Sequence, residues 1–333
     1  MNKITVIGNT SSGKTCFLYA MYNYIAYGYI DGFTMSASDN IQDKKLQDAF
    51  SQLENTQLGD QRFPRPSQDR EQYDFSLQYG FSELASFQWA DYPGGYIGQK
   101  EDELISDLRT SDAWVIFIDG EKLYKAIQTE DLHKRRIESV KACGIYNKFI
   151  TELRARGSKI PKSIPIIVTK GDLIINSNIN DAIDKIVECV KLGISSLFVD
   201  LPGKDSSLVS ISLVSLGHEI AQNNYTGKLD PINIEYPITI SMLSILSNLF
   251  SNKYREIKDL ITLINKDKEK IFSSKKRRDE WKVEIQSKIP DIERWQKMAK
   301  AILATLSDDK KLYTQGTEMS LVKYYQNVFL IRE

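Results

Sequence analysis

The sequence has few cysteines, few histidines and no excess of charge, and each shortage removes a class of function. The 3 cysteines among 333 residues, Cys16, Cys143 and Cys189, lie far apart, without the close spacing of a metal site. This usage predicts reduced thiols in a cytoplasmic protein. His133 and His218 stand alone in the sequence, which favours structural or surface roles over catalysis.

Charge and hydropathy exclude two further kinds of partner. Lys+Arg and Asp+Glu both number 44, so the formal net charge is +0 and bulk charge gives no support for nucleic acid. No apolar run approaches the roughly 20 residues of a membrane-spanning helix, so we expect no transmembrane segment. With 41% hydrophobic and 26% charged residues, the chain is long enough for one large domain and an appendage.

One octapeptide near the N-terminus, GNTSSGKT, fits the phosphate-binding pattern GxxxxGK[ST] at every fixed position. It lies between an apolar stretch, Ile4 to Ile7, that predicts a strand and a run, Cys16 to Met21, that predicts a helix. Lys14 would lie along the terminal phosphates, and the Thr15 hydroxyl would ligate Mg²⁺. The expected phosphate-binding residues are Gly8, Asn9, Thr10, Ser11, Ser12, Gly13, Lys14, Thr15 and Cys16.

A second motif follows the next expected strand, Leu84 to Ala90, where the sequence Asp-Tyr-Pro-Gly fits the D-x-x-G pattern. Asp91 at the strand end would hold Mg²⁺ through a water, and the Gly94 N–H would reach a γ-phosphate. The alternative is an ordinary Asp-x-Pro-Gly turn. We predict a catalytic set of Lys14, Asp91, Gly94 and Gln99.

Two later segments predict recognition of a guanine base. The buried strand Ile164 to Val168 leads into Thr-Lys-Gly-Asp, which matches [NT]-K-x-D. The Asp172 carboxylate would accept from the guanine N1 and N2 protons, a pair that adenine lacks, and the Lys170 stem would lie across the base. A β-like run, Val209 to Val214, ends at a short Ser-Leu-Gly loop. The expected base-binding residues are Thr169, Lys170, Asp172, Ser215 and Leu216.

These four elements, in this order, resemble the TRAFAC-type P-loop GTPases over residues 1 to about 260. The segments WADYPGGY and GNTSSGKTCFLYAMY are most similar to the bacterial double-GTPase family. The resemblance implies an α/β fold, a P-loop NTPase three-layer sandwich whose mostly parallel sheet has one antiparallel edge strand. It also implies GTP/GDP and Mg²⁺ as ligands, and a place in bacterial conflict and defence systems beside adaptor or effector proteins.

The switch I metal ligand of such GTPases is less evident. Residues 38 to 60 have apolar positions near helical spacing and predict an inserted helix. In double-GTPase relatives a Pro-rich turn ending in Thr precedes the next strand, and Ser67 occupies that place here. We predict metal ligation by Thr15, Ser67 and Asp91, while an exposed Pro-Ser loop remains an equal alternative for Ser67.

The residue after Gly94 is Gly95, where many GTPases place a glutamine that orients the attacking water. Gln99 or Glu101, a partner or a second protomer would then supply that group, or hydrolysis is slow. We favour a slow, Mg²⁺-dependent switch.

Two alternative functions remain open. They are a non-hydrolysing nucleotide-bound adaptor and an ATP-dependent enzyme such as a kinase. The lid arginines of a kinase would be Arg135, Arg136, Arg154 and Arg156.

The segment 261–333 predicts a helical C-terminal extension. Apolar residues from Trp281 to Leu306 recur at three- and four-residue steps, and Pro290 is expected to begin the second of two helices there. This stripe would pack on the nucleotide domain or serve as a docking or oligomerisation surface. The basic cluster at 275–278 is expected to be a solvated helix face. The run Val328 to Ile331 predicts a further edge strand.

Overall fold

The structure is a computed structural model that describes residues 2–28, 32–65, 69–80, 82–94, 101–157, 160–198, 207–217, 220, 227–269, 274–306, 310–314 and 317–330. The chain forms two compact units. The first comprises Met1–Ser241 and Lys311–Glu318, and the second Met242–Lys310 and Met319–Glu333. The predicted boundary near residue 260 falls inside a single helix, α8 (Tyr236–Lys268).

The first unit is built around a sheet with the strand order β2-β3-β4-β1-β5-β6-β7-β8-β9. The adjacent strands β4, β1, β5, β6 and β7 are parallel, which confirms the predicted fold class. The expected antiparallel strand is β3, one position inside the edge, and β8 adds another at the far side. The strands are β1 (Asn2–Gly8), β2 (Phe33–Ala37), β3 (Glu71–Tyr79), β4 (Ser82–Asp91), β5 (Ala113–Ile118), β6 (Ser163–Val168), β7 (Leu208–Leu213), β8 (Lys311–Thr314) and β9 (Thr317–Ser320).

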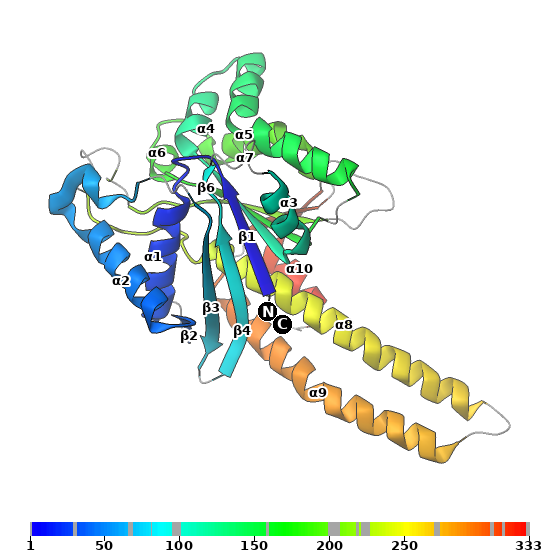
Figure 1. Ribbon diagram of the computed structural model, residues 1–333. Coiled ribbons are helices and arrows are strands. Elements are labelled where there is room, and N and C mark those ends of the chain that lie inside the picture. Colours follow the sequence, from blue (N-terminus) through cyan, green and yellow to red (C-terminus); the bar gives the residue numbers. More distant parts are fainter. Residues whose placement is uncertain are drawn as a thin grey trace. The chain divides into compact units, whose positions relative to one another are not determined.

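Helices cover both faces of this sheet (Figure 1). Strands β5 and β6 are buried at every residue, as continuous apolar runs in a parallel sheet require. The predicted insertion is helical and consists of α2 and η1. The helices of the unit are α1 (Lys14–Ala26), α2 (Asn40–Glu54), η1 (Thr56–Arg62), α3 (Glu101–Thr110), α4 (Gly120–Ile127), α5 (Leu132–Ala155), α6 (Asp172–Ile175), α7 (Ala182–Gly193) and η3 (Ser195–Leu197).

The two faces of the sheet bury different side chains. On one face Phe17 of α1 packs against Trp89 and Phe117, with ring centroids 6.3 and 5.0 Å away. On the other face α3, α4, α5 and α7 bury a hydrophobic cluster that includes Trp114 and Ile116 of β5. Because the parallel strands end at one edge of the sheet, the loops that follow them meet there.

The second unit contains a helical hairpin. The helices α8 and α9 (Lys275–Ala304) lie antiparallel side by side (Figure 1). Lys288 of α9 pairs with Glu256 of α8 at 2.9 Å, and near the turn Arg278 pairs with the buried Asp267 at 3.0 Å. A short helix, α10 (Leu321–Val328), packs on the hairpin, where Phe329 meets Phe250 at 5.3 Å between ring centroids.

Two predictions for the C-terminal region are wrong. Pro290 lies inside α9 and does not begin a helix, because the apolar stripe on both sides holds one continuous helix despite the bond lost at the Gln286 carbonyl. Val328 ends helix α10, so no strand begins there. Within the described ranges, no helix combines the length and apolar character needed to cross a bilayer.

Candidate functional site

The loop between β1 and α1 presents its backbone to a ligand. Ser11 and Gly13 both have left-handed backbone conformations, with φ values of 62° and 82°. Gly13 caps α1 without a side-chain hydrogen bond, so the first amides of this helix remain available to an anion. The Lys14 ammonium donates to the Gly8 carbonyl at 3.0 Å and to the Asn9 carbonyl at 3.3 Å. Burial lowers the pKa of Lys14, and the charge of Asp91 opposes this.

Asp91 and Gly94 come to this loop from the end of β4. A Cβ on Gly94 would lie 1.8 Å from the Thr10 nitrogen, so only glycine allows this approach. The Thr15 hydroxyl lies 3.5 Å from Asp91 Oδ2. Asp91 is only 4% exposed, and burial raises its pKa to about 6 against the lowering effect of Lys14.

The phosphate end of the site has a donor set that fits a hard cation. Two buried oxygens there, Asp91 Oδ1 and Ser12 Oγ, have no hydrogen-bond partner among the residues that the structure describes. Hydroxyl and carboxylate oxygens are the ligands that Mg²⁺ takes beside phosphates. Thr15 and Asp91 are therefore the residues that would hold Mg²⁺.

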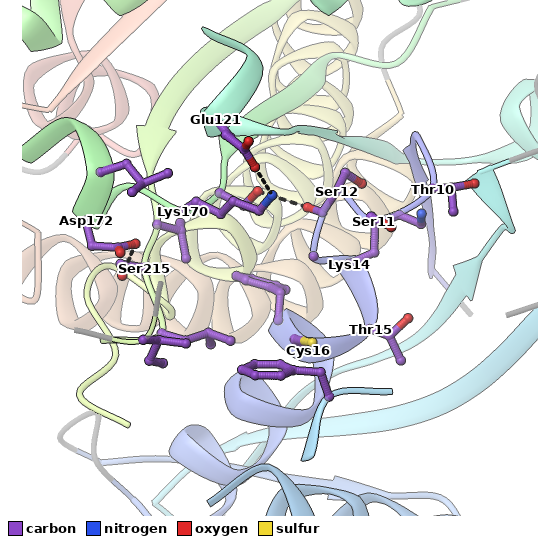
Figure 2. A pocket seen from close by; sticks show the side chains of 18 of the residues that line it. Thr10, Ser11, Ser12, Lys14, Thr15, Cys16, Glu121, Lys170, Asp172 and Ser215 are labelled. Atoms are coloured by element: carbon purple, nitrogen blue, oxygen red, sulfur yellow. Dashed lines mark hydrogen bonds and ion pairs between the residues drawn. The ribbon is translucent and has the colours of Figure 1, made fainter. Parts of the chain in front are cut away.

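At the opposite end of the site, the Asp172 carboxylate is held by a serine. Ser215 Oγ donates to Asp172 Oδ1 at 2.9 Å and accepts from the Gly217 amide at 3.1 Å (Figure 2). Asp172 begins α6 after the short loop that follows β6, and Ser215 follows β7, so two neighbouring parallel strands place the pair. The arrangement orients a buried carboxylate that can accept two parallel N–H bonds.

Thr169 and Lys170 lie between the phosphate end of the site and the end that contains Asp172. Thr169 Oγ1 donates to the Ser12 carbonyl at 3.0 Å, which joins the base-side loop to the phosphate loop. Lys170 has a left-handed φ of 51°, and its ammonium lies 3.0 Å from Asp119. The same ammonium lies 3.2 Å from Glu121 (Figure 2). Burial would lower the pKa of Lys170, but these two acids raise it above its ordinary value.

One cavity of about 770 Å³ contains both ends, a volume suited to a nucleotide-sized ligand. Many predicted residues line it, whereas Gly8, Asn9 and Asp91 contact Lys14 or Thr15 behind the lining. The predicted residues in the lining are Thr10, Ser11, Ser12, Gly13, Lys14, Thr15, Cys16, Gly94, Thr169, Lys170, Asp172, Ser215 and Leu216. The lining residues that sequence reasoning missed include Phe63, Pro64, Arg65, Glu121, Tyr124, Lys125 and Gln128.

Some predictions about this site stay open. Ser67 and Gln99 lie outside the described residues, so their proposed roles remain predictions.

Burial raises the pKa of the Cys16 thiol to about 12, so this thiol in the cavity lining is not a nucleophilic thiolate at neutral pH. Of the arginines considered for a kinase lid, Arg135 pairs with Glu188 at 3.1 Å and Arg154 donates to the Ser196 carbonyl.

Tyr146 is a supporting residue that sequence reasoning missed. Its phenol, on α5, donates to the Phe117 carbonyl at 2.8 Å and accepts from the Asn9 amide at 2.9 Å. It thereby joins the phosphate loop to the end of β5. Burial raises its pKa, so the phenol stays protonated and can continue to donate. A tyrosine among other aromatic residues of a long helix carries no local signal of this role.

Comparisons with known proteins place these features in a family. The model of the Double-GTPase 2 family matches residues 2–205. Curated proteins give no match. A solved structure of the signal recognition particle receptor SRb-GTP/SRX complex from Chaetomium thermophilum is similar at 14% identity and a TM-score of 0.36, covering 65% of this chain and 90% of that chain. The S. cerevisiae Ski7 GTPase-like domain bound to GTP is similar at 15% identity and a TM-score of 0.32, covering 67% of this chain and 45% of that chain.

Proposed function

This chain belongs to the Double-GTPase 2 family, and from that premise we propose that it is a Mg²⁺-dependent GTP-binding switch with slow GTP hydrolysis. The observation that carries the proposal is the Asp172–Ser215–Gly217 arrangement, which shares one cavity with the phosphate loop. The carboxylate suits the paired N–H groups on the guanine edge. Adenine presents an unprotonated N1 at the corresponding position, which the carboxylate would repel.

The proposed reaction converts GTP and water to GDP and phosphate. The water oxygen bonds to the γ-phosphorus, the bond from that phosphorus to the β–γ bridging oxygen breaks, and both water protons leave with the phosphate. The buried Lys14 ammonium and the loop amides neutralise charge on the phosphate oxygens. Asp172 and Ser215 fix the base, so that the phosphates are held in register with the loop. Mg²⁺, when bound, would supply a further positive charge at the β- and γ-phosphates.

Slow hydrolysis follows from Gly95, which has no side chain with which to orient the water. Gln99 or a group from a partner would then provide the orientation. The same glycine supports a second candidate function, a non-hydrolysing adaptor that uses bound nucleotide for assembly. The buried Lys14 and Asp91 favour the hydrolytic switch, since each is a charged group that is costly to bury and that phosphoryl transfer would use.

We further propose that the switch acts in the cytoplasm on an adaptor or effector protein of a bacterial conflict or defence system. The support is the family membership and the separate helical unit, α8 to α10, which offers a docking or homo-oligomerisation surface. Addition of a co-encoded partner is expected to change turnover or nucleotide release. Unchanged kinetics at saturating partner would contradict the signalling role.

Nucleotide selectivity tests the proposed function most directly. Fluorescent mant-GDP and mant-GTPγS would be titrated with Mg²⁺ and competed with ADP, ATP and XDP. The wild type is expected to prefer guanine by about a hundredfold or more, because two hydrogen bonds to a buried carboxylate are lost with adenine. Asp172→Asn should move this preference towards xanthine, since the amide pairs with the xanthine O2 acceptor and N1 donor.

The matched control is Asp48→Asn, on the exposed face of α2 away from the cavity. It should leave every affinity unchanged. Adenine nucleotides that bind as tightly as guanine nucleotides, or an Asp172→Asn protein that keeps wild-type selectivity, would sink the guanine assignment. An ATP-dependent activity would then become the better proposal.

A further inference from the structure

Four cationic residues line the cavity: Lys14, Arg65, Lys125 and Lys170. Three of them are engaged, Lys14 with backbone carbonyls and the other two lysines with nearby carboxylates. Arg65 is exposed and has no hydrogen bond or ion pair among the described residues. Within that part of the chain it is the cavity cation whose side chain is held by neither a backbone carbonyl nor a carboxylate.

Arg65 lies between the helical insertion and strand β3, and it lines the same cavity as the phosphate loop. Six residues after it, Glu71 begins β3. This strand runs antiparallel to β4, and Glu71 lies opposite Asp91 in the pairing. Six residues span at most about 20 Å. Arg65 is therefore tethered to the strand position opposite the carboxylate that lies beside Thr15.

Arg62 fixes the other side of this segment. Its side chain is 1% exposed, and its Nη2 donates to the Gly227 carbonyl at 2.8 Å. The next residue after Gly227 contacts the base-side loop, since a Cβ on Gly217 would lie 2.6 Å from the Lys228 carbonyl. A buried guanidinium is costly to move, so this tie holds the segment against the base-side loop.

The residue after Arg62 also belongs to the cavity. The Phe63 ring lies 5.1 Å from the Arg62 guanidinium carbon and lines the cavity together with Pro64 and Arg65. Pro64 restricts the backbone between the anchored Arg62 and the available Arg65. We call the segment 62–65 the strap. Arg62 anchors it, and Arg65 lies in the lining of the cavity.

We propose that Arg65 is a catalytic residue that acts within its own chain, placing a guanidinium on the γ-phosphate as the bond to the bridging oxygen breaks. This inference rests on the proposed GTP hydrolysis and deepens it. An arginine in this role neutralises the charge that develops on the transferring and bridging oxygens, whereas it does not replace the missing water-orienting group. Arg62 is the positioning residue that holds the strap.

The test compares Arg65→Ala and Arg65→Lys with the wild type in the full chain. Three quantities are measured: GTPγS affinity, single-turnover GTP hydrolysis, and formation of a mant-GDP complex with aluminium fluoride, which mimics the transferring phosphoryl group. Arg156→Ala, an exposed arginine at the end of α5, is the matched control. Millimolar guanidinium chloride is added to Arg65→Ala as a rescue.

The proposal expects Arg65→Ala to slow hydrolysis about a thousandfold and to abolish the aluminium fluoride complex, while GTPγS affinity changes less than about threefold. Arg65→Lys should restore only part of the rate, because an ammonium lacks the planar fork. Guanidinium should partly restore both the rate and the complex. Arg156→Ala should match the wild type in every measurement.

Arg62→Lys provides an independent check of the strap. It should slow hydrolysis without weakening GDP binding, and it should add little to the loss in an Arg62→Lys/Arg65→Ala double variant, because both changes remove the same contribution. Independent, additive losses would contradict the anchoring role.

Two results would overturn the assignment of Arg65. One is hydrolysis by Arg65→Ala within about threefold of wild type, or a rate that falls only as far as GTPγS affinity falls, since a phosphoryl charge donor acts in the transition state. The other is a wild type that binds guanine nucleotides yet neither hydrolyses GTP nor forms the aluminium fluoride complex. Absence of guanine-nucleotide binding in the wild type would instead overturn the proposed function itself.

Discussion

The two ends of the cavity are built differently. At the base end Asp172 Oδ1 is already bonded to Ser215, and Lys170 is already paired with Asp119. At the phosphate end the Thr15 hydroxyl reaches Asp91 Oδ2 only at 3.5 Å, and Ser12 Oγ is buried with no hydrogen-bond partner among the described residues. The carboxylate at the base end is therefore held by a closer hydrogen bond from the protein than the carboxylate at the phosphate end.

This difference separates recognition from response. An unsatisfied buried polar group costs about 1–3 kcal/mol, so the phosphate end is less stable without nucleotide and metal. At the base end the bond from Ser215 to Asp172 is already present in the protein without a ligand. Loss of a γ-phosphate would thus change the contacts of Asp91 and Gly94 while the base stays bound.

The largest effect is expected from Lys14→Met, which removes the buried charge at the phosphate end but keeps most of the stem. Nucleotide affinity should fall about a thousandfold, equivalent to roughly 4 kcal/mol, because charged hydrogen bonds to the phosphates are lost. Isothermal titration with GDP would measure it. Lys125→Met, which removes a cation paired with Glu121, is the control and should cost less than about tenfold. A comparable loss of affinity in both variants would contradict the larger contribution expected of Lys14 in the phosphate loop.

Asp91→Asn should show opposite effects on the free and the loaded protein. Without ligand, thermal stability should rise by about 1 kcal/mol, because a buried carboxylate with an unsatisfied oxygen becomes neutral. With nucleotide, the Mg²⁺-dependent part of the affinity should fall about a hundredfold. Thermal unfolding with and without GDP, in EDTA and in Mg²⁺, measures both effects.

The base end supplies the comparison for that result. Asp172→Asn should not stabilise the free protein, because its carboxylate already accepts from Ser215 and the weaker amide bond replaces a charged one. Equal stabilisation by the two substitutions would break the contrast between the two ends.

Tyr146→Phe tests how far the phosphate loop depends on the hydrogen bonds that the Tyr146 phenol makes to it and to the end of β5. The substitution leaves the Asn9 amide and the Phe117 carbonyl without the phenol, so the free energy of unfolding should fall by about 1–3 kcal/mol. Urea unfolding measures this loss. The control Tyr27→Phe changes a tyrosine that is 65% exposed and should have an effect within about 0.5 kcal/mol. A neutral Tyr146→Phe would show that the loop holds its shape alone.

The smallest effect is expected from Ser215→Ala at the base end. Removing one hydroxyl bond to Asp172 should weaken guanine binding about fivefold, roughly 1 kcal/mol, and leave the weak adenine binding unchanged. Ser210→Ala is a matched control on the preceding strand, since the Ser210 hydroxyl is buried and has no hydrogen-bond partner in the described part of the chain. Loss of guanine affinity in Ser210→Ala would point to a general effect of β7 on the site.

The sequence predicts the parallel core because its signals are local. Buried runs such as Ala113 to Ile118 and Ser163 to Val168 indicate strands, and the motif that follows each strand lies at the same sheet edge. The role of Tyr146 depends on contacts between segments far apart in the chain, and no motif beside it reveals them. The role proposed for Arg65 depends on its place in the cavity lining, which the sequence alone does not show.

The same reasoning explains the errors near the C-terminus. The four-residue strand Lys311–Thr314 has no alternation long enough to be recognised, and its pairing with β7 is set by distant residues such as Val209, opposite Tyr313. Val328 to Ile331 is more apolar and therefore a better strand by propensity. In the structure Val328 instead completes an amphipathic helix, so tertiary packing overrides the local preference.

The return of the chain to its first unit has a consequence for synthesis on the ribosome. Strand β8 pairs with β7, yet the whole hairpin of α8 and α9 is translated between them. Until β8 emerges, β7 presents an open strand edge, which is a site of mispairing in nascent chains. A fragment that stops at residue 260 would retain that exposed edge permanently. Such a fragment should aggregate, whereas a chain with β8 reconnected to β7 by a short linker should remain monodisperse.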